Sequence, residues 1–211
     1  MKQKIIVVGI IGLLLCLTIT PIINSQDIKA EEQKNNSLAT STGVNYYAVI
    51  AACANYEDPS ANLPVGEYKL KKIYRGLISN ENWKEENIIL LINDNPDPTN
   101  GYVGGATKEN IENALKEMAG KVTKNDVFLF SWQGHGSAVP ESETTGLNDD
   151  SELDGYDEVI CPWDCTRNSD RALTNYITDD ELDRYFSNIN ADGMMLIFES
   201  CFSGGLINDN I

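Results

Sequence analysis

Four short apolar runs, separated by longer amphipathic or polar stretches, dominate the chain after its first forty or so residues. The runs cover residues 45–53, 88–92, 126–132 and 194–198. Their length and their content of β-branched and aromatic residues are typical of strands. Because polar residues do not alternate with the apolar ones, we expect these strands to be buried on both faces, as in a parallel sheet covered by helices.

The stretches between the runs predict helices. The apolar faces consist of Tyr68, Leu70, Ile73, Tyr74, Leu77 and Ile78 in the first helix and of Ile111, Leu115 and Met118 in the second. Thr107 is placed to cap the second helix, and Thr178 and Glu181 form a capping box at the start of a third. The order strand, helix, strand, helix, strand, insertion, helix, strand predicts an α/β domain of three layers around a mainly parallel central sheet.

The N-terminal residues have the composition of a leader. Residues 1–25 combine two lysines near the start with an almost wholly apolar run over 5–23. This pattern predicts either a signal peptide or an uncleaved N-terminal membrane anchor, and both imply a secreted or extracytoplasmic protein. Residues 26–44 are polar and aperiodic, as in a flexible linker. The folded domain is therefore expected to comprise residues 45–211.

The overall composition fits one globular domain with a strongly acidic surface. The 211 residues are 42% hydrophobic and 23% charged, which supplies enough apolar material for one core. Sixteen Lys and Arg against 32 Asp and Glu give a net charge of −16, which becomes −18 without residues 1–25. Such a charge disfavours nucleic acids and anionic membrane surfaces as partners and favours metal ions and basic peptides.

The sequence contains one histidine, His135, which follows the third apolar run and lies between Gly134 and Gly136. A single histidine excludes two-histidine metal motifs, and any histidine base must be His135. Cys201 follows the fourth run, also beside glycines. Functional residues gather beyond the carboxyl ends of parallel strands, and a Cys–His pair is the minimal arrangement for a thiolate nucleophile. The alternative is that both residues are structural.

The other cysteines fit a nucleophile less well. Cys16 lies in the apolar N-terminal run, and Cys53 ends the first predicted strand without a neighbouring glycine turn. Cys161 and Cys165 are separated by three residues in the segment CPWDC, so they either form a disulfide in an oxidising compartment or stay reduced. Their spacing differs from the C-x-x-C of thioredoxin-type enzymes, which makes thiol–disulfide exchange a weaker alternative activity.

Together these blocks resemble the caspase-like cysteine peptidases, the group of caspases, metacaspases, legumain and gingipains. The resemblance rests on the His-Gly pair after an apolar strand and on the acidic-Ser-Cys-x-Ser-Gly block at 199–204. The segments DGYDEVICPWD (154–164) and ITDDEL (177–182) are similar to metacaspases in particular. The resemblance implies a caspase-like three-layer fold and the hydrolysis of peptide bonds.

The resemblance also implies the roles of the site residues. Cys201 would be the nucleophile and His135 the general acid and base, and the reaction would pass through an acyl-enzyme. The backbone N–H groups of Gly136 and Cys201 would stabilise the oxyanion. Neither a third orienting side chain nor a required cofactor is implied. The competing interpretation is a catalytically inactive binding module on the same fold.

Two glutamates are candidates for binding the substrate side chain at P1. Glu199 lies two residues before Cys201, where metacaspases carry an acid, and Glu67 lies near the start of the first helix. No Arg adjoins either position to read an acidic P1 residue. We therefore expect peptide or protein substrates with Arg or Lys at P1. Legumain, which prefers Asn, also has Glu at the position of Glu199, so Asn specificity remains an alternative.

Residues 140–159 hold eight acidic residues and no basic one. The simplest interpretation is a solvated loop, but ordering so many like charges would be helped by a hard divalent cation. In calcium-activated metacaspases, Asp residues of this loop and the Asp-Asp pair before the following helix form such a site. Asp150, Asp179 and Asp180 are the nearest counterparts here, so Ca²⁺ is a candidate activator.

Two further expectations concern self-cleavage of the chain and the completeness of the domain at its C-terminal side. Arg167 and Arg171 lie in the polar segment CTRNSDRA, which is a candidate self-cleavage site if P1 is basic, although such residues are often merely solvated. The chain ends ten residues after Cys201, whereas caspase-like domains continue with further strands. The fold is therefore expected to be incomplete at its C-terminal side. The oligomeric state is not predicted.

Overall fold

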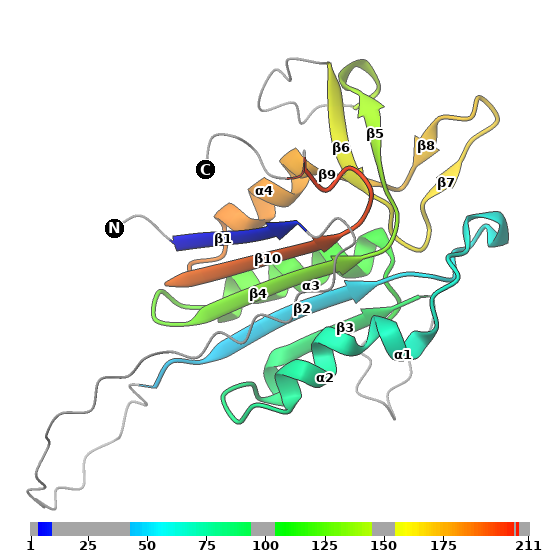
Figure 1. Ribbon diagram of the computed structural model, residues 1–211. Coiled ribbons are helices and arrows are strands. Elements are labelled where there is room, and N and C mark those ends of the chain that lie inside the picture. The colour runs from blue at the N-terminus through cyan, green and yellow to red at the C-terminus, as the bar shows by residue number, and fades with distance from the viewer. Residues whose placement is uncertain (1–3, 10–42, 94–103, 145–154, 205, 207–211) are drawn as a thin grey trace, which may run out of the picture. The chain divides into compact units, whose positions relative to one another are not determined.

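The computed structural model describes residues 4–9, 43–93, 104–144, 155–204 and 206. Its centre is a sheet of five parallel strands in the order β1-β10-β4-β2-β3 (Figure 1). The strands are β1 (Lys4–Gly9), β2 (Tyr46–Ala52), β3 (Ile88–Ile92), β4 (Val127–Gln133) and β10 (Gly193–Glu199). The four predicted apolar runs are β2, β3, β4 and β10, so the mainly parallel central sheet is confirmed.

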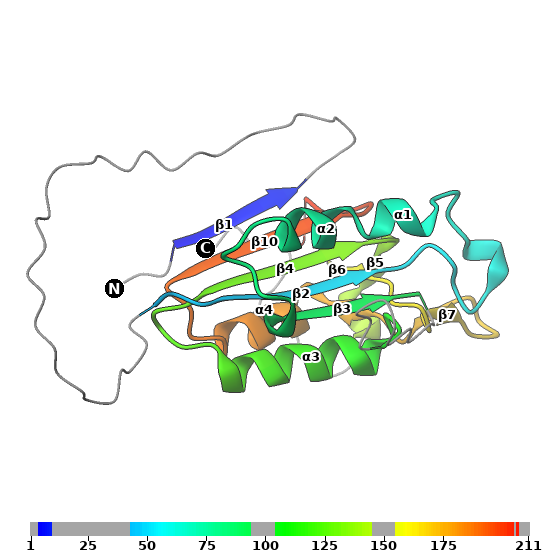
Figure 2. The same cartoon turned by 90° about the horizontal axis from the view of Figure 1, so that it is seen from below.

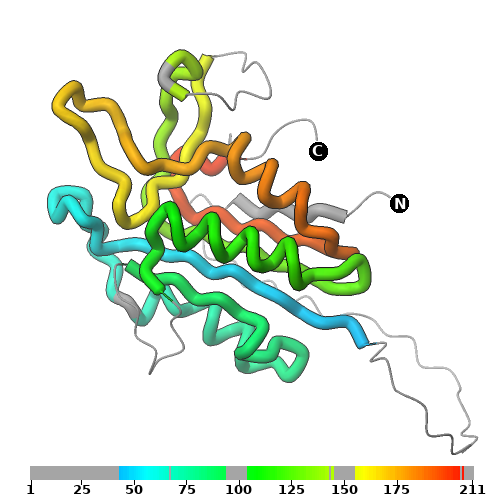
Figure 3. Tube along the Cα trace, turned by 180° about the vertical axis from the view of Figure 1, so that it is seen from behind, coloured from blue at the N-terminus to red at the C-terminus, as the bar shows by residue number. Residues whose placement is uncertain are grey.

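Helices cover both faces of this sheet, which gives the three layers that the sequence predicts. Helices α3 (Lys108–Lys121) and α4 (Asp179–Ser187) pack on one face, and α1 (Glu67–Leu70) and α2 (Lys72–Ile78) lie on the other (Figures 2 and 3). In β2, Val49 and Ala51 contribute to the core under α3 and α4, while the alternate residues face α1 and α2. A strand buried on both faces has few polar positions, which explains the continuous apolar runs.

Local signals in the sequence account for the ends of α3 and α4. The Thr107 hydroxyl accepts a hydrogen bond from the N–H of Asn110, and α3 ends one residue beyond Gly120. The Thr178 hydroxyl accepts from the N–H of Glu181, whose carboxylate accepts from the N–H of Thr178, so the predicted capping box is present. Each cap pairs backbone donors that a helix leaves unsatisfied at its start.

The first predicted helix differs from the expectation. It is broken at Lys71 into α1 and α2, and its apolar face is narrower than predicted. Leu70 and Tyr74 are buried, whereas Tyr68 is 77% exposed and covers the guanidinium of Arg75. The helical spacing was therefore correct, but Tyr68 packs on a charged side chain rather than on the sheet.

The segment between β4 and α4 holds a second, antiparallel sheet that the sequence did not predict. Its strands are β5 (Gly136–Pro140), β6 (Tyr156–Ile160) and β9 (Ile177–Thr178), in the order β5-β6-β9. The short strands β7 (Thr166–Arg167) and β8 (Leu173–Thr174) form a separate hairpin. The acidic residues of 154–160 resemble a solvated loop and so hide the strand pattern. One of them, Asp157, is in fact buried at 2% exposure, and its carboxylate accepts a hydrogen bond from the Thr144 hydroxyl.

The start of the predicted leader is described as a strand. Residues Lys4–Gly9 form β1, which pairs in parallel with β10 at the edge of the central sheet. The same residues open the predicted signal peptide or anchor, and that prediction remains untested, as does the linker. Within the described part of the chain, no helix has the length and hydropathy needed to cross a membrane.

Asp126 holds strands together at the end of the central sheet where β2 and β4 begin. It is 2% exposed and accepts hydrogen bonds from the backbone and side-chain nitrogens of Asn45, both at 3.0 Å. It also accepts from the N–H and hydroxyl of Thr123, both at 2.8 Å. Burial opposes ionisation, but these hydrogen bonds outweigh it and lower the pKa of Asp126 below its usual value. The carboxylate therefore ties the start of β2 to the start of β4.

Candidate active site

Strands β4 and β10 are neighbours, and they end at the same level of the sheet. Gln133, the last residue of β4, pairs with Glu199, the last residue of β10. The Gln133 amide donates a hydrogen bond to the Glu199 carboxylate at 2.9 Å. His135 and Cys201 each lie two residues beyond this pair. The structure therefore brings the two predicted catalytic residues to one edge of the sheet.

The two loops touch through Gly136 and Cys201. A Cβ atom added to Gly136 would clash with the carbonyl oxygen of Cys201 and lie 3.1 Å from the Ser200 hydroxyl oxygen. Only glycine permits this approach, because any side chain would push the two loops apart. Gly134 supports the same junction, since its N–H donates to the Glu199 carbonyl at 3.2 Å.

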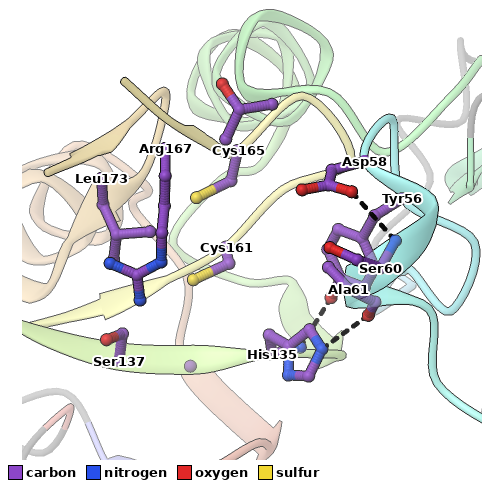
Figure 4. A pocket seen from close by; sticks show the side chains of 12 residues that line it. Tyr56, Asp58, Ser60, Ala61, His135, Ser137, Cys161, Cys165, Arg167 and Leu173 are labelled. Atoms are coloured by element: carbon purple, nitrogen blue, oxygen red, sulfur yellow. Dashed lines mark hydrogen bonds between the residues drawn. The ribbon is translucent and has the colours of Figure 1, made fainter. Parts of the chain in front are cut away.

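Backbone and ring contacts hold His135 in place. Its N–H donates to the hydroxyl oxygen of Tyr56 at 2.7 Å, and the two rings pack with their centroids 4.9 Å apart. The ring Nε2 lies 2.8 Å from the carbonyl oxygen of Ala61 (Figure 4). Burial raises the pKa of the Tyr56 phenol far above its usual value, so Tyr56 stays neutral.

The contact with Ala61 selects the protonated nitrogen of the neutral imidazole. A carbonyl oxygen only accepts hydrogen bonds, so Nε2 must carry the hydrogen. In the neutral ring, the lone pair that can take a proton is then on Nδ1. The Ala61 carbonyl thus orients the ring without a third side chain. Sequence reasoning missed this residue, because every residue has a backbone carbonyl and no residue type marks the one that matters.

The cysteines differ in accessibility. Of the four free cysteines in the described residues, Cys201 is exposed, whereas Cys53, Cys161 and Cys165 are buried. An accessible thiol beside a histidine is the arrangement that nucleophilic chemistry requires. The next residue, Phe202, has a φ of 59° and is 57% exposed, so the chain turns sharply after the thiol.

The Gly136 N–H is oriented away from β6. Gly136 faces Ile160 in the antiparallel pair of β5 and β6, and the hydrogen bond beside this pair runs from Cys161 N to His135 O at 3.0 Å. Gly136 and Ile160 are therefore a non-hydrogen-bonded pair, whose N–H groups point outward from the ladder. The N–H predicted to stabilise an oxyanion is thus not used by the sheet.

The two predicted substrate-binding acids lie in different places. Glu199 is exposed at the end of β10, beside the His135 and Cys201 loops. Glu67 is the first residue of α1, which follows the loop that carries Ala61. The sequence interpretation also placed Glu67 near the start of the first helix. The described part of the structure does not include the side chain of Glu67.

A pocket of about 340 Å³ opens beside His135 (Figure 4). Its lining comes from the loop after β2, from β5, from the β6–β7 turn and from the β7–β8 hairpin, and it includes Asp58, Ser137 and Arg167. Asp58 is an acid that sequence reasoning did not select. Hydrogen bonds from Ser60 lower the pKa of Asp58, so it is ionised at neutral pH.

The predicted calcium ligands are only partly described. Asp179 and Asp180 form the first turn of α4, where carboxylates also stabilise the positive end of the helix dipole. Asp150 lies outside the described residues. Within the described part, no three His, Cys, Asp or Glu side chains are grouped so that they could hold a metal ion.

Arg167 and Arg171 are the ends of a turn in the β7–β8 hairpin. The Arg167 guanidinium donates to the Arg171 carbonyl at 2.8 Å, and Arg171 has a φ of 68°. The Asn168 side chain accepts from the N–H groups of Asp170 and Ala172. The candidate self-cleavage segment is therefore an exposed turn with its own hydrogen bonds, and the side chain of Arg167 reaches the pocket (Figure 4).

Comparison with known proteins gives a consistent result. Residues 39–209 match the family model of the metacaspase, peptidase C14 domain. Metacaspase-4 of Arabidopsis thaliana is 31% identical over 156 residues, which is 74% of this chain and 33% of that protein. Metacaspase-1A of Aspergillus oryzae is 33% identical over 141 residues, which is 66% of this chain and 30% of that protein. The chain thus spans about a third of the length of these relatives.

A solved structure supports the fold. The crystal structure of a Geobacter sulfurreducens protein superposes with a TM-score of 0.52 at 22% sequence identity. The match covers 74% of this chain and 50% of the other. At this level of identity the likeness concerns the arrangement of strands and helices alone.

Proposed function

The chain belongs to the metacaspase family, and from this premise we propose that it is a cysteine endopeptidase with Cys201 as its nucleophile and His135 as its general acid and base. The single observation that carries the proposal is the close approach of Gly136 to the Cys201 carbonyl. This contact holds an exposed thiol and the only histidine of the sequence at the ends of two adjacent strands.

The proposed reaction has two halves. In the first, His135 takes the proton of the Cys201 thiol, the sulfur attacks the peptide carbonyl carbon, and the same proton is then given to the leaving amine. In the second, His135 takes a proton from water, the hydroxide attacks the thioester, and the thiol is released with its proton restored. The Ala61 carbonyl supports these roles because it keeps the hydrogen on Nε2 and leaves Nδ1 to exchange protons.

The backbone N–H groups of Gly136 and Cys201 are proposed to stabilise the negative charge on the carbonyl oxygen. Two arguments support this assignment. The Gly136 N–H is not engaged in the β5–β6 ladder, and Gly136 lies directly against the Cys201 backbone. Donors fixed by the fold need no reorganisation when charge develops, so they favour the transition state over the substrate.

We propose that substrates carry Arg or Lys at P1. Glu199 supports this because its carboxylate lies at the end of β10 beside the catalytic loops and carries no basic partner among the described ion pairs. The strongly acidic chain also favours cationic substrates through long-range attraction. Glu67 is proposed as a second acid of the same pocket, on the strength of its position after β2.

Calcium activation is proposed from the acidic segment rather than from an assembled site. Within the described residues, no three His, Cys, Asp or Glu side chains are grouped so that they could hold a metal ion. The proposal therefore depends on Asp150 and its acidic neighbours. It predicts that a calcium chelator reduces activity, and unchanged rates across a chelator titration would refute it.

We also propose export of the protein and cleavage of the chain by its own activity. The apolar run over 5–23 supports secretion or anchoring, and the exposed turn at Arg167 and Arg171 supports cleavage there by an enzyme with basic P1 specificity. N-terminal sequencing of the secreted or membrane fraction tests the first proposal. Mapping of cleavage products after incubation of the purified chain tests the second.

The decisive experiment for the proposed activity is a panel of peptides with Arg, Lys, Asn or Asp at P1, assayed with and without calcium. The wild type is expected to cleave after Arg and Lys. Cys201→Ala is expected to be inactive, while the matched variant Cys53→Ala retains the exposed thiol and is expected to remain active if it folds. Hydrolysis that survives in Cys201→Ala would refute the nucleophile, and cleavage after Asn would identify a legumain-like specificity.

A further inference from the structure

Cys161 and Cys165 both line the wall of the His135 pocket, and their sulfurs point to the same side of it, toward Arg167 (Figure 4). The two residues are 6% and 7% exposed, so they are buried yet border an open cavity. The proposed peptidase mechanism uses neither thiol. Free cysteines in such positions are usually inert, but two that line the same cavity wall can undergo chemistry that a lone one cannot.

The backbone holds the two thiols in fixed positions. The segment between them is a tight turn closed by a hydrogen bond from Cys165 N to Pro162 O at 3.0 Å. The turn is anchored to the start of α3, because Trp163 N donates to Ala106 O at 2.8 Å and Asp164 accepts from the N–H of Lys108 at 2.9 Å. A turn tied at its centre brings its two ends together without further ordering of the chain.

The two thiols have different acidities. A hydrogen bond from the Cys165 thiol lowers the pKa of Cys161, and the positive charge of Arg167 acts in the same direction against the effect of burial. The pKa of Cys165 is raised, because its proton is held by that hydrogen bond and its thiol is buried. Cys161 is therefore the better nucleophile toward a disulfide, and Cys165 is placed to react second.

We propose that Cys161 and Cys165 form a reversible disulfide in the wall of the His135 pocket, with a small disulfide such as oxidised glutathione as the oxidant, and that this disulfide lowers the activity of the site. The pocket gives the oxidant access to sulfur atoms that are otherwise buried. The pair is thus a modification site distinct from the catalytic dyad.

The exchange is balanced in two steps. Cys161 loses its proton to solvent, and its thiolate attacks one sulfur of oxidised glutathione, which breaks the glutathione disulfide, forms a mixed disulfide and releases one glutathione thiolate that takes up a proton. Cys165 loses its proton to solvent and attacks the Cys161 sulfur, which forms the protein disulfide and releases the second glutathione thiolate. The two protein thiols are oxidised by two electrons, and one oxidised glutathione is reduced to two glutathione molecules.

A structural link connects the pair to the catalytic histidine. The N–H of Cys161 donates to the backbone carbonyl of His135 at 3.0 Å, and the indole of Trp132 donates to the same oxygen at 3.2 Å. Forming a covalent bond draws the two sulfurs closer than a thiol hydrogen bond does, so the Cys161 backbone must adjust. Because that backbone holds the His135 loop, we expect the histidine to move out of its reactive position.

Cys53 is the competing partner and is the weaker candidate. It is fully buried at the end of β2, and its thiol donates to the Asn55 carbonyl at 3.5 Å. It lies near enough to Cys161 to influence the pKa of that thiol, but it does not line the pocket. An oxidant entering through the pocket therefore meets Cys161 and Cys165 first.

The first test follows the thiols and does not require peptidase activity. The Cys201→Ala protein is equilibrated in glutathione buffers from reducing to oxidising, quenched with acid, alkylated after unfolding, and analysed by peptide mass spectrometry. We expect the peptide that contains Cys161 and Cys165 to lose two hydrogens and to resist alkylation in oxidising buffers. The Cys165→Ser substitution should abolish this species, and Cys53→Ser should not.

Two outcomes of this test would overturn the proposal. One is that both thiols remain open to alkylation in the most oxidising buffer. The other is a disulfide between Cys53 and either partner in place of the expected one. The Cys201→Ala protein without any further substitution gives the main reading, so a Cys165→Ser variant that fails to fold does not obscure the result.

The second test measures the effect on activity and rests on the proposed function. Wild type and Cys165→Ser are assayed on a P1-Arg peptide across the same buffers, and each rate is expressed relative to the fully reduced rate of the same protein. Oxidation of Cys201 affects both proteins, so a difference between them reports on the Cys161–Cys165 disulfide. The wild type should lose half its rate at a ratio of oxidised to reduced glutathione that is at least tenfold lower than the ratio at which Cys165→Ser loses half of its own rate. Equal midpoints would overturn the inhibitory role. If no peptidase activity exists, the thiol test still decides whether the disulfide forms.

Discussion

The backbone of Gly136 lies against the carbonyl oxygen of Cys201, although the two residues are 65 positions apart in the sequence. Parallel pairing of β4 with β10 makes this possible, because Gln133 and Glu199 end the two strands in register. The contact leaves no room for a Cβ atom. It therefore sets the distance between the two loops that carry the proposed dyad, and its disruption gives the most direct test of the site.

Gly136→Ala is expected to reduce kcat/KM by roughly 100-fold, because a shift of about 1 Å between catalytic groups costs on that order. The methyl group would meet backbone, which cannot move aside as a flexible side chain can. Gly120→Ala in α3 is the matched control, since a Cβ there meets nothing within 4 Å. Activity is measured on a P1-Arg peptide and folding by circular dichroism. Full activity of a folded Gly136→Ala protein would contradict the assignment.

Tyr56→Phe removes the oxygen that accepts the His135 N–H while keeping the ring that packs on the imidazole. A part-buried donor would lose its partner, so we expect a loss of about 1–3 kcal/mol of stability together with a fall in kcat. Tyr68→Phe is the control, because Tyr68 is 77% exposed on α1. Urea unfolding and steady-state kinetics give the two readings. A variant that loses stability but keeps the kcat of the wild type would show that Tyr56 does not position His135.

Glu199→Gln tests the proposed reading of a basic P1 residue. The amide keeps an oxygen that can accept the hydrogen bond from Gln133, so the local structure should persist while the charge is lost. We expect kcat/KM for P1-Arg and P1-Lys peptides to fall roughly fivefold, the scale of a partly solvated ion pair. The exposed Glu86→Gln serves as the control for net charge. An equal loss on P1-Asn peptides would show that Glu199 acts on structure and not on specificity.

The lowered pKa of Asp126 predicts how the free energy of unfolding depends on pH. Its pKa is lowered in the folded protein, so its contribution is fully present above the unfolded-state value of about 3.9 and is lost as pH falls through the lower folded value. Asp126→Asn is expected to lower stability at pH 7 by about 1–3 kcal/mol and to flatten the loss of stability in acid. The exposed Asp183→Asn is the control. Urea unfolding between pH 3 and pH 7 measures both, and an unchanged acid slope would contradict the role of Asp126.

Most of the central fold was predictable from local patterns. The runs that became β2, β3, β4 and β10 are continuous in apolar residues because both sheet faces are covered. The caps at Thr107 and Thr178 were also visible, since each depends on residues within three positions. The antiparallel sheet was not, because its strands carry acids such as Asp157, which is buried with its carboxylate bonded to Thr144, a residue outside these strands.

The sequence by itself determined the order of the strands along the chain and the identity of His135 and Cys201 as candidates, since strand-end glycines and residue chemistry are local properties. Only the tertiary structure decided which strands are neighbours, that Gly136 closes onto Cys201, and that the Ala61 carbonyl orients the imidazole. It also placed Cys161 and Cys165 in a pocket wall rather than on the surface. These relationships join residues far apart in the chain through backbone atoms and packing, which no residue type encodes.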